Sequence, residues 1–520
     1  MTETSLIGFA RGSEGGSAFN AQNPASGEKL EPSFTHASSE DVARACSLAS
    51  DAALAMARLK GSEKAHFLRD LADRIDGLTD QLVETMTLET GLPEPRVRGE
   101  TGRTISQLRM FADLVEEGSW VDARIDRAQP DRQPIPKPDL RSMNRPVGPV
   151  GVFCASNFPL AFSVAGGDSA SAWAAGCPVI VKAHHAHPGT ALLVGSAVVD
   201  SVRSCGLPEG AFSLIFGDGR TVGQALVKHP AIKAVGFTGS RSGGRALFEL
   251  AAQRVEPIPV YAEMSSVNPL FILPGMSDEK MAEIAIGLQG SATLGVGQFC
   301  TNPGIVFYPA GEGGQSFVGT FLEKMKSTPS APMLHSGIRE SYGVGLDALA
   351  SCSCVELLLS ASSNKGPGGC HAEATVLATD SASFMANDRM LDEVFGPSTL
   401  LVSYESADEL ERVMQSMEGQ LTASLFGLEE DLPRFESLLD QLETKAGRVL
   451  FNQFPTGVEV CSAVVHGGPY PATTDGRSTS VGTGAILRFA RPVCYQGFPD
   501  ELLPEELQNE NPMSLKRTES

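Results

Sequence analysis

From residue 147 onward, short apolar runs rich in β-branched residues alternate with stretches of helical periodicity. The runs lie in VGPVGVFCASNFP, CPVIVKAHH, GAFSLIFG and AIKAVGFTGS, and helical patterns occupy 189–204 and 219–229 between them. Strands that alternate with helices form a parallel sheet that is covered on both faces. The sequence therefore predicts an α/β fold whose ligands bind at the carboxyl ends of the strands.

The region before residue 147 is predicted to be mainly helical. Ala, Leu and Val recur at helical spacing over 39–59, where Ser39 is a candidate N-cap, and the pattern continues over 63–90 and 97–116. Four prolines follow, at positions 130, 134, 136 and 138. Because proline lacks an N–H donor, they predict a connector or an edge strand.

A second α/β region is predicted beyond residue 265. NPLFILPG (268–275) has the pattern of a strand, and DEKMAEIAIGLQGSATLG has that of a helix that leads to Cys300. GTGAILRFARPVCYQGFP (482–499) predicts a late strand, and the tail NENPMSLKRTES is expected to be loosely ordered.

The composition excludes several classes of partner. The formal net charge of −21 disfavours binding to nucleic acid or to an anionic membrane surface. The ten cysteines lack the spacing of a zinc site or a disulfide scaffold. We find no secretory signal pattern and no apolar run of about 18 residues, so we expect a cytoplasmic protein.

Cys300 is the most informative cysteine. It lies in TLGVGQFCTNPGIVF (293–307), where the preceding glycines permit close approach of other molecules to the backbone. This context favours a nucleophile, whereas a free cysteine is more commonly a buried apolar side chain. Since no Lys or Arg adjoins Cys300 in the sequence, any lowering of its pKa must come from groups brought near in space.

Two polar residues end apolar runs and are candidates for catalysis. Glu263, in VYAEMSSVNP (260–269), can serve as a general base at a strand terminus, or it can simply face solvent there. Asn157, in CASNFPL, can donate to a developing oxyanion, or it can be an ordinary turn residue.

Two further segments have features of a phosphate site. In FTGSRSGG (237–244), Gly239, Ser240 and Gly244 can open a helix whose N–H groups meet a phosphate. In VIVKAHHAHPGT (179–190), Lys182 stands at a strand end and is followed by histidines 184, 185 and 187. No accompanying carboxylate or H-E-x-x-H pattern supports a metal site there, so we expect none.

The order of these segments resembles the aldehyde dehydrogenase superfamily over nearly the whole chain. The matching elements are SNFP, VIVK, FTGSRSGGR, EMSSVNP, GQFCTNP and EVFGP. Departures from the commonest pattern, such as Ser156 and KAHH, resemble the branch of 2-oxoglutarate semialdehyde (2,5-dioxopentanoate, also 2,5-dioxovalerate) dehydrogenases and their NADP-preferring relatives. FPTGVEVCSAVVHGGPYPATT (454–474) and RFARPVCYQGFPDELLP (488–504) resemble the same branch.

The resemblance implies oxidation of an aldehyde through a covalent thioester. Cys300 is the implied nucleophile, the Asn157 amide and the Cys300 N–H are the implied oxyanion donors, and Glu263 is the implied base for hydrolysis. Presence of Glu263 disfavours a CoA-acylating enzyme. The resemblance also assigns Glu393 of EVFGP to the nicotinamide ribose and places Phe395 beside it.

Charge favours NADP over NAD as the cofactor, although NAD is not excluded. NAD-preferring members have a glutamate where this chain has His185, and a carboxylate there would repel a 2′-phosphate. Lys182 attracts that phosphate, and Arg220 in FGDGRTVG resembles the arginine that pairs with it in NADP-preferring relatives.

The substrate implied by the resemblance is 2-oxoglutarate semialdehyde. Arg103, in GRTISQLRMF, is a candidate anchor for its carboxylate, and His466 is a candidate neighbour of the substrate tunnel; a surface arginine and a structural loop histidine are the alternatives. A fatty or broad aldehyde specificity is the alternative within the same class. A non-catalytic binding protein on the same fold is the alternative from another class.

The implied architecture has a Rossmann-like cofactor domain, an α/β catalytic domain and a small β oligomerisation arm. We expect the cofactor domain at 1–128 and 150–264, the catalytic domain at 265–470, the arm at 129–149 and 480–498, and a tail at 499–520. Edge strands of such an arm can pair between subunits, which predicts a homodimer or homotetramer.

Overall fold

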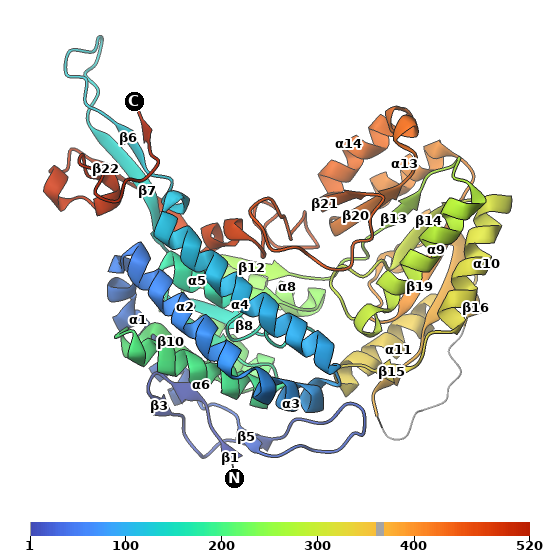
Figure 1. Cartoon of the computed structure of the whole chain (residues 1–520), viewed down its shortest axis with the longest axis horizontal. Coiled ribbons are helices and arrows are strands. Elements are labelled where there is room, and N and C mark those ends of the chain that lie inside the picture. Colours follow the sequence, from blue (N-terminus) through green and yellow to red (C-terminus); the bar gives the residue numbers. More distant parts are fainter. Residues whose placement is uncertain (1, 360–368) are drawn as a thin grey trace.

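The computed structural model describes residues 2–359 and 369–520, which form two α/β units and a small protruding arm (Figure 1). The sheet of the first unit has seven strands in the order β12-β11-β8-β9-β10-β2-β3. The first five strands in this order are parallel, and β2 (Leu6–Ile7) and β3 (Ala10–Arg11) continue the sheet antiparallel. The parallel strands are β8 (Val150–Phe153), β9 (Val179–Lys182), β10 (Phe212–Ile215), β11 (Ala234–Thr238) and β12 (Val260–Glu263).

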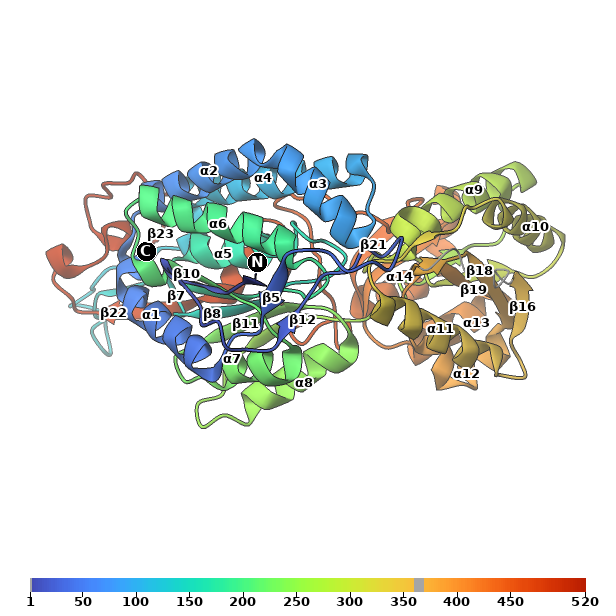
Figure 2. The ribbon, with the colours of Figure 1, turned by 90° about the horizontal axis from the view of Figure 1, so that it is seen from below.

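Helices cover both faces of this sheet (Figure 2). Alternate strand residues point to opposite faces, so Ile180 and Val235 meet one helical layer, whereas Val179 and Val181 meet the other. The first layer contains α1 (Ser39–Arg58), α7 (Gln224–Lys228) and α8 (Arg241–Ala252). The second contains α2 (Gly61–Gly77), α3 (Thr79–Thr90), α4 (Glu94–Glu117), α5 (Gly167–Ala175) and α6 (Pro188–Ser204).

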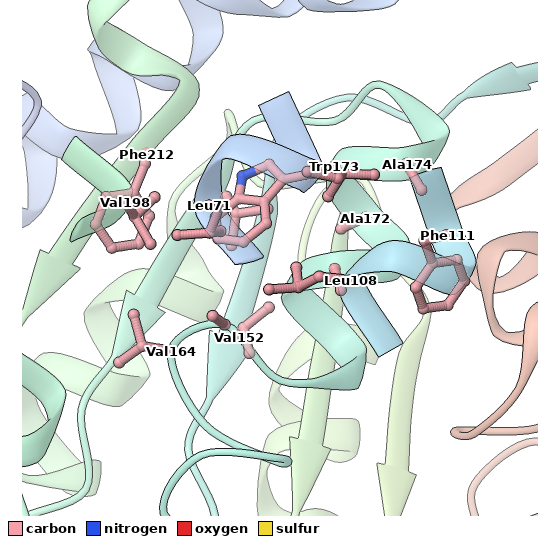
Figure 3. Packing of buried hydrophobic residues seen from close by; sticks show 14 of the residues in the cluster. Leu71, Leu108, Phe111, Val152, Val164, Ala172, Trp173, Ala174, Val198 and Phe212 are labelled. Atoms are coloured by element: carbon pink, nitrogen blue, oxygen red, sulfur yellow. The ribbon is translucent and has the colours of Figure 1, made fainter. Parts of the chain in front are cut away.

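The core of the second layer is built around Trp173 of α5 (Figure 3). The indole contacts the rings of Phe67 and Phe212 edge to face, at centroid distances of 5.5 and 5.9 Å. Its Nε1 donates to the Ala211 carbonyl at 3.2 Å, so the buried polar atom is satisfied. Because the rest of α5 consists of small residues, this helix lies fully buried between the sheet and α4.

The second unit also has a seven-stranded sheet, in the order β16-β18-β19-β14-β13-β20-β21. All its strands are parallel except β16, which pairs antiparallel with β18. The strands are β13 (Leu270–Ile272), β14 (Ile305–Pro309), β16 (Glu356–Leu359), β18 (Thr375–Asp380), β19 (Ser398–Tyr404), β20 (Gln420–Phe426) and β21 (Ala446–Phe451).

Helices again form two layers around this second sheet, each with its own apolar cluster. One layer has α9 (Asp278–Thr293) and α10 (Glu312–Lys326). The other has α11 (Ser336–Ala350), α12 (Ser381–Met385), α13 (Ala407–Ser416) and α14 (Glu436–Lys445). Two small sheets lie outside these units' main sheets. One has the strand order β1 (Thr2–Glu3), β5 (Ser33–Thr35), β4 (Ala18–Phe19), and the other pairs β15 (Ala331–Pro332) with β17 (His371–Ala372).

The arm is a four-stranded sheet in the order β22-β7-β6-β23. β7 (Leu140–Pro146) and β22 (Ala490–Gln496) come from the two segments predicted to form the arm, and the proline-rich stretch joins β6 (Arg124–Asp126) to β7. The tail is not loosely ordered as expected, because it supplies β23 (Thr518–Glu519) and buries Leu503, Leu507 and Leu515.

Two other local expectations need correction. Helix α1 is capped by Ser38 and not by Ser39, because the Ser38 side chain accepts from the Asp41 N–H in a capping box. Residues 483–489 form a 3-10 helix that packs under α5, with Phe489 fully buried, and so do not belong to the arm. Within the described residues we find no helix with the length and apolarity that a membrane crossing requires.

The chain between β21 and the arm returns from the second unit to the first (Figure 1). This return segment, residues 452–489, joins the first sheet where the Met264 N–H donates to the Ala472 carbonyl at 2.8 Å. It is held further by the Ser480 N–H, which donates to the His466 carbonyl at 2.8 Å. The return segment therefore covers the end of β12, where Glu263 is located.

Candidate active site

The loop that carries Cys300 is built from left-handed backbone. Gly295, Val296 and Gly297 have φ angles of 57°, 60° and 65°. A β-branched residue in this region costs on the order of 1–3 kcal/mol, so the surrounding structure must hold Val296 in place. A Cβ on Gly297 would lie 2.3 Å from the carbonyl of Gly396, so this glycine permits close approach of the chain's own EVFGP segment. The sequence had suggested instead an approach by other molecules.

Asn268 fixes the position of the same loop. It adopts a left-handed φ of 45°, and its Nδ2 donates to the carbonyls of Cys300 and Asn302 at 2.8 and 2.9 Å. Its Oδ1 accepts from the Thr422 hydroxyl at 3.0 Å. The sequence marked EMSSVNP only as part of a resemblance, and the positioning role of Asn268 becomes visible only in three dimensions.

The structure brings Cys300, Glu263 and His466 together from three separate segments. His466 Nε2 lies 2.9 Å from Glu263 Oε1 and 3.3 Å from Cys300 Sγ. The Ser480 hydroxyl donates to the other carboxylate oxygen, Oε2, at 2.7 Å. Glu263 and His466 are buried, with exposed fractions of 3% and 1%. The predicted nucleophile and base thus share one histidine, which the sequence had placed only near the tunnel.

The electrostatics of this trio favour a protonated thiol beside an ionised carboxylate. Burial raises the pKa of Cys300 well above its usual value, and the negative charge of Glu263 raises it further. Burial alone would raise the pKa of Glu263 too, but the contacts with His466 and Ser480 outweigh burial and lower it. The resting site therefore holds a thiol, and the contacts of His466 Nε2 give its proton a route to the Glu263–His466 pair when the thiolate nucleophile forms.

Asn157 contacts the turn that carries Cys300. It follows β8, and its Nδ2 donates to the Gln298 carbonyl at 3.2 Å. Among the described residues no acceptor takes the Cys300 backbone N–H. A side-chain amide and an unsatisfied N–H at one turn are donors of the kind that stabilise an oxyanion.

The predicted cofactor residues lie at the carboxyl ends of strands of the first sheet. Ser240 caps α8 directly after β11, and its side chain accepts from the Gly243 N–H at 3.2 Å, which confirms the predicted strand–turn–helix. Gly239 and Gly244 are closely packed, since a Cβ on them would lie 2.8 Å from Phe237 and 2.7 Å from Met264. Lys182 ends β9 and is buried.

Other predicted cofactor residues lie at the edge of this region. His185 is exposed in the loop after β9, and Arg220 is exposed in a short π-helix, Gly219–Gly223. Glu393 and Phe395 line a small cavity together with Gly297 of the nucleophile loop. Burial raises the pKa of Glu393 to about 7, and the Ser266 N–H donates to its Oε1 at 3.5 Å.

The histidines after β9 form part of a larger cluster. Ring nitrogens of His184, His185 and His335 lie within 4.8 Å of one another, a spacing that a metal ion can bridge. His335 comes from the start of α11, in the second unit, so sequence spacing could not reveal this group. Burial lowers the pKa of His184 well below its usual value and that of His335 to about 4, so both rings are neutral.

The predicted substrate residue Arg103 is half-buried on α4. Its Nη1 donates to the carbonyl of Val458, in the return segment. The Val458 side chain packs beside a buried aromatic cluster that includes Phe299, next to the nucleophile. Sequence analysis missed Ser480, Asn268, His335 and Arg448, because none of them lies in a pattern that indicates chemistry.

A sequence profile described as the aldehyde dehydrogenase family matches residues 10–470. The chain belongs to this family. It is therefore an oxidoreductase, and the predicted resemblance is confirmed.

Two curated aldehyde dehydrogenases match nearly the whole length. Alpha-ketoglutaric semialdehyde dehydrogenase 2 of Azospirillum brasilense is 48% identical over 518 residues, covering 99% of this chain and 98% of its own. An alpha-ketoglutaric semialdehyde dehydrogenase of Acinetobacter baylyi is 44% identical over 493 residues, covering 93% and 91%.

Solved aldehyde dehydrogenase structures confirm the predicted fold. A 3,6-anhydro-L-galactose dehydrogenase in complex with NAP has a TM-score of 0.81 at 20% identity, and the match covers 95% of this chain and 100% of that one. Betaine aldehyde dehydrogenase of Staphylococcus aureus in complex with NAD⁺ has a TM-score of 0.82 at 19% identity, and the match covers 97% and 96%. The two α/β units and the arm are thus the architecture of an aldehyde dehydrogenase.

Replacing His466 by phenylalanine is expected to shift the pH dependence of this aldehyde dehydrogenase. His466 opposes the effect of burial on Glu263, so its removal raises the pKa of that carboxyl. The acidic limb of the kcat/KM profile then moves to higher pH, and kcat at neutral pH falls by about 10- to 100-fold. Steady-state rates from acidic to alkaline pH measure the shift. His66→Phe, at an exposed position on α2, is the control. A lower rate with an unmoved profile would contradict the assigned role.

Proposed function

We propose that this aldehyde dehydrogenase oxidises 2-oxoglutarate semialdehyde to 2-oxoglutarate with NADP, through a thioester on Cys300. The observation that carries the chemistry is the contact of Cys300 and Glu263 with the same nitrogen of His466. The substrate is supported by the two relatives at 48% and 44% identity, both named for alpha-ketoglutaric semialdehyde.

The first half-reaction begins with transfer of the thiol proton to the Glu263–His466 pair. The thiolate then attacks the aldehyde carbon, and the carbonyl oxygen becomes an oxyanion that the Asn157 amide and the Cys300 N–H stabilise. When bound, the nicotinamide supplies an acceptor for the hydride that leaves the tetrahedral adduct. Loss of that hydride leaves an acyl group on Cys300.

The second half-reaction is hydrolysis of the thioester. Once the Glu263–His466 pair has released the thiol proton to solvent, Glu263 takes a proton from water, which attacks the acyl carbon and expels the Cys300 thiolate. The lowered pKa of Glu263 keeps this base ionised at neutral pH. Ser480, which donates to Oε2, holds the carboxylate so that Oε1 faces His466. The same carboxylate therefore serves both halves of the reaction.

The residues at the strand ends fit a dinucleotide phosphate. Lys182 and Arg220 have no ion-pair partner among the described residues, so both charges are available to an anion. Position 185 offers a neutral imidazole in place of a carboxylate, and although the residue is exposed at its edge, desolvation by its neighbours and the charge of Lys182 lower the pKa of the ring. The N-terminus of the 12-residue helix α8, opened by Gly239 and Ser240, suits the diphosphate. Glu393 and Phe395 would hold the nicotinamide ribose.

The arm is the proposed site of subunit association, giving a homodimer or homotetramer. Strand β22 is at the edge of the arm sheet, so no strand among the described residues pairs with the backbone groups that it directs away from β7. The proposed domains are 1–128 with 150–264 for the cofactor, 265–470 for catalysis, and 129–149 with 490–498 for the arm, since 483–489 pack under α5. All ten cysteines are free, which suits the reducing cytoplasm.

Initial rates with three aldehydes and two cofactors test this function. We expect kcat/KM to be highest for 2,5-dioxopentanoate with NADP. Its kcat/KM should exceed those for succinate semialdehyde and for octanal by about tenfold or more, and kcat/KM with NADP should exceed that with NAD by a similar factor. One or two charge-assisted contacts provide a difference of this size. The readout is formation of the reduced cofactor.

Each other outcome overturns a defined part of the proposal. Preference for octanal would replace the substrate by a fatty aldehyde and leave the thioester mechanism intact. A higher kcat/KM with NAD would overturn the role of Lys182, His185 and Arg220. If no aldehyde is oxidised with either cofactor, the chain is a binding protein on this fold.

A further inference from the structure

Two arginines reach the same loop of the return segment from the two α/β units. Arg103 projects from α4 and donates to the Val458 carbonyl. Arg448, on β21, donates from Nη1 to the Gly457 carbonyl at 3.1 Å and from Nη2 to the Pro455 carbonyl at 2.6 Å. The two guanidinium groups therefore flank residues 455–458.

Neither guanidinium has a carboxylate partner. In residues 2–359 and 369–520 no carboxylate oxygen lies within 4.0 Å of Arg103 or Arg448. The Nε atom of each is buried without a hydrogen-bond partner. This is unexpected in a chain with 62 acidic and 41 basic residues, where an anion is easily supplied. The pair of charges therefore lacks a counterion within the protein.

Arg96, in the same neighbourhood, has the carboxylate partner that Arg103 and Arg448 lack, although its Nε is likewise buried without a hydrogen-bond partner. It lies two turns before Arg103 on α4, and its Nη1 is 3.0 Å from the buried carboxylate of Glu100. It also covers the rings of Phe158 and Phe299, at 4.5 and 5.3 Å from their centroids. Arg96 is thus neutralised by the protein, whereas Arg103 feels Glu100 only as a more distant charge.

Both unpaired charges lie close to the nucleophile. The positive charge of Arg103 opposes the effects of burial and of Glu263 on the pKa of Cys300. Burial lowers the pKa of Arg448, and the charge of Cys300 acts in the opposite direction. Val458, whose carbonyl accepts from Arg103, packs beside the aromatic cluster in which Phe158 and Phe299 meet edge to face at 5.3 Å, and Phe299 directly precedes Cys300. Both arginines are half-buried.

We infer that Arg103 and Arg448 together bind the carboxylate of the substrate, so that a 2-oxo acid aldehyde extends from them to Cys300. A guanidinium binds a carboxylate through parallel hydrogen bonds, and the two free Nε–H groups supply donors for it. The substrate carboxylate provides the counterion that the protein lacks, and an uncharged aldehyde does not. This inference rests on the proposed function, for which it assigns the origin of specificity, with Arg448 as the partner that sequence analysis missed.

Substitution by glutamine separates this role from simple support of the loop. We expect Arg448→Gln and Arg103→Gln each to lower kcat/KM for 2,5-dioxopentanoate by about 10- to 100-fold, the loss of one or two charge-assisted hydrogen bonds. Pentanal is an aldehyde of the same length without the carboxylate. Its kcat/KM should stay within about threefold of wild type in each variant, because an uncharged substrate makes no ion pair with the arginine that is removed. Pentanal oxidation also shows that each variant is folded. Arg109→Gln, on the same helix but paired with Asp73 at the surface, is the control.

Inhibition by the product distinguishes failure of this inference from failure of the proposed function. We expect 2-oxoglutarate to compete with pentanal in the wild type, and to inhibit either arginine variant about tenfold less. If the wild type does not oxidise 2,5-dioxopentanoate but 2-oxoglutarate still inhibits through Arg448, the proposed function fails and the carboxylate site stands. Equal losses for the acid and for pentanal in both variants would show that the arginines only support residues 455–458, and would overturn the inference.

Discussion

Replacement of Cys300 by alanine is expected to reduce kcat for aldehyde oxidation by about 10⁴-fold or more, because no other nucleophile occupies its position. The Glu263–His466 pair, which contacts Cys300 and remains in the variant, can move protons but forms no thioester. Formation of the reduced cofactor in the steady state and in a single turnover measures the loss. Both should disappear together, since attack by the Cys300 thiolate precedes hydride loss and hydrolysis alike.

A matched control is available among the other cysteines. Cys494 is exposed on β22 in the arm, so Cys494→Ala should keep wild-type kcat. The Cys300→Ala variant should still bind NADPH, because Lys182 and α8 are unchanged. Residual oxidation within about tenfold of wild type in the pure Cys300→Ala variant would show that the reaction does not proceed through this thiol.

Replacement of Glu263 by glutamine is expected to reduce kcat by about 10²- to 10⁴-fold, the usual contribution of a positioned base. Glutamine preserves the shape of the side chain and its contact with Ser480, but it accepts no proton from water. The acyl group should therefore accumulate on Cys300. Stopped-flow measurement should show a burst of reduced cofactor, slower than in wild type, followed by a far slower steady state.

The pH dependence of the wild type provides a second test of Glu263. Its pKa is lowered in the folded enzyme, so the base stays ionised as the pH falls below the usual range of a glutamate and protonates only at lower pH. The acidic limb of kcat should therefore reflect this lowered pKa, and it should vanish in Glu263→Gln. Glu249→Gln, at an exposed site on α8, should leave the profile unchanged. Loss of the burst with an unchanged steady state would exclude Glu263 as the hydrolytic base.

Regular structure explains how much of the site could be predicted from sequence. Glu263 and Lys182 each end an apolar run, and the end of a parallel strand is where a site opens, so their placement follows from periodicity. Cys300 was visible because its glycine-rich turn has no structural reason to contain a cysteine. In each case the local sequence contains the physical cause of the geometry.

The residues that sequence analysis missed lie in positions that helical or strand periodicity does not mark as functional. Ser480 belongs to the return segment, which has neither a helical nor a strand repeat around it. Arg448 lies on β21, where an arginine at an edge strand ordinarily faces solvent. The tail was wrongly expected to be loose because it is polar, yet Leu515 packs against Gly118, whose missing Cβ would lie 2.6 Å from it. Such contacts join distant segments, and a local pattern cannot show them.

The return segment also determines when the site can exist during synthesis. His466 follows Glu263 by 203 residues, which a ribosome adds in roughly 10–40 s at ~5–20 residues per second. From the addition of Cys300 onward, 37 residues into that interval, the nascent chain has its nucleophile and its base but lacks the histidine that joins them. A truncated product that ends before the return segment would expose the end of β12, which makes premature termination in this region a source of inactive chains with an uncovered sheet.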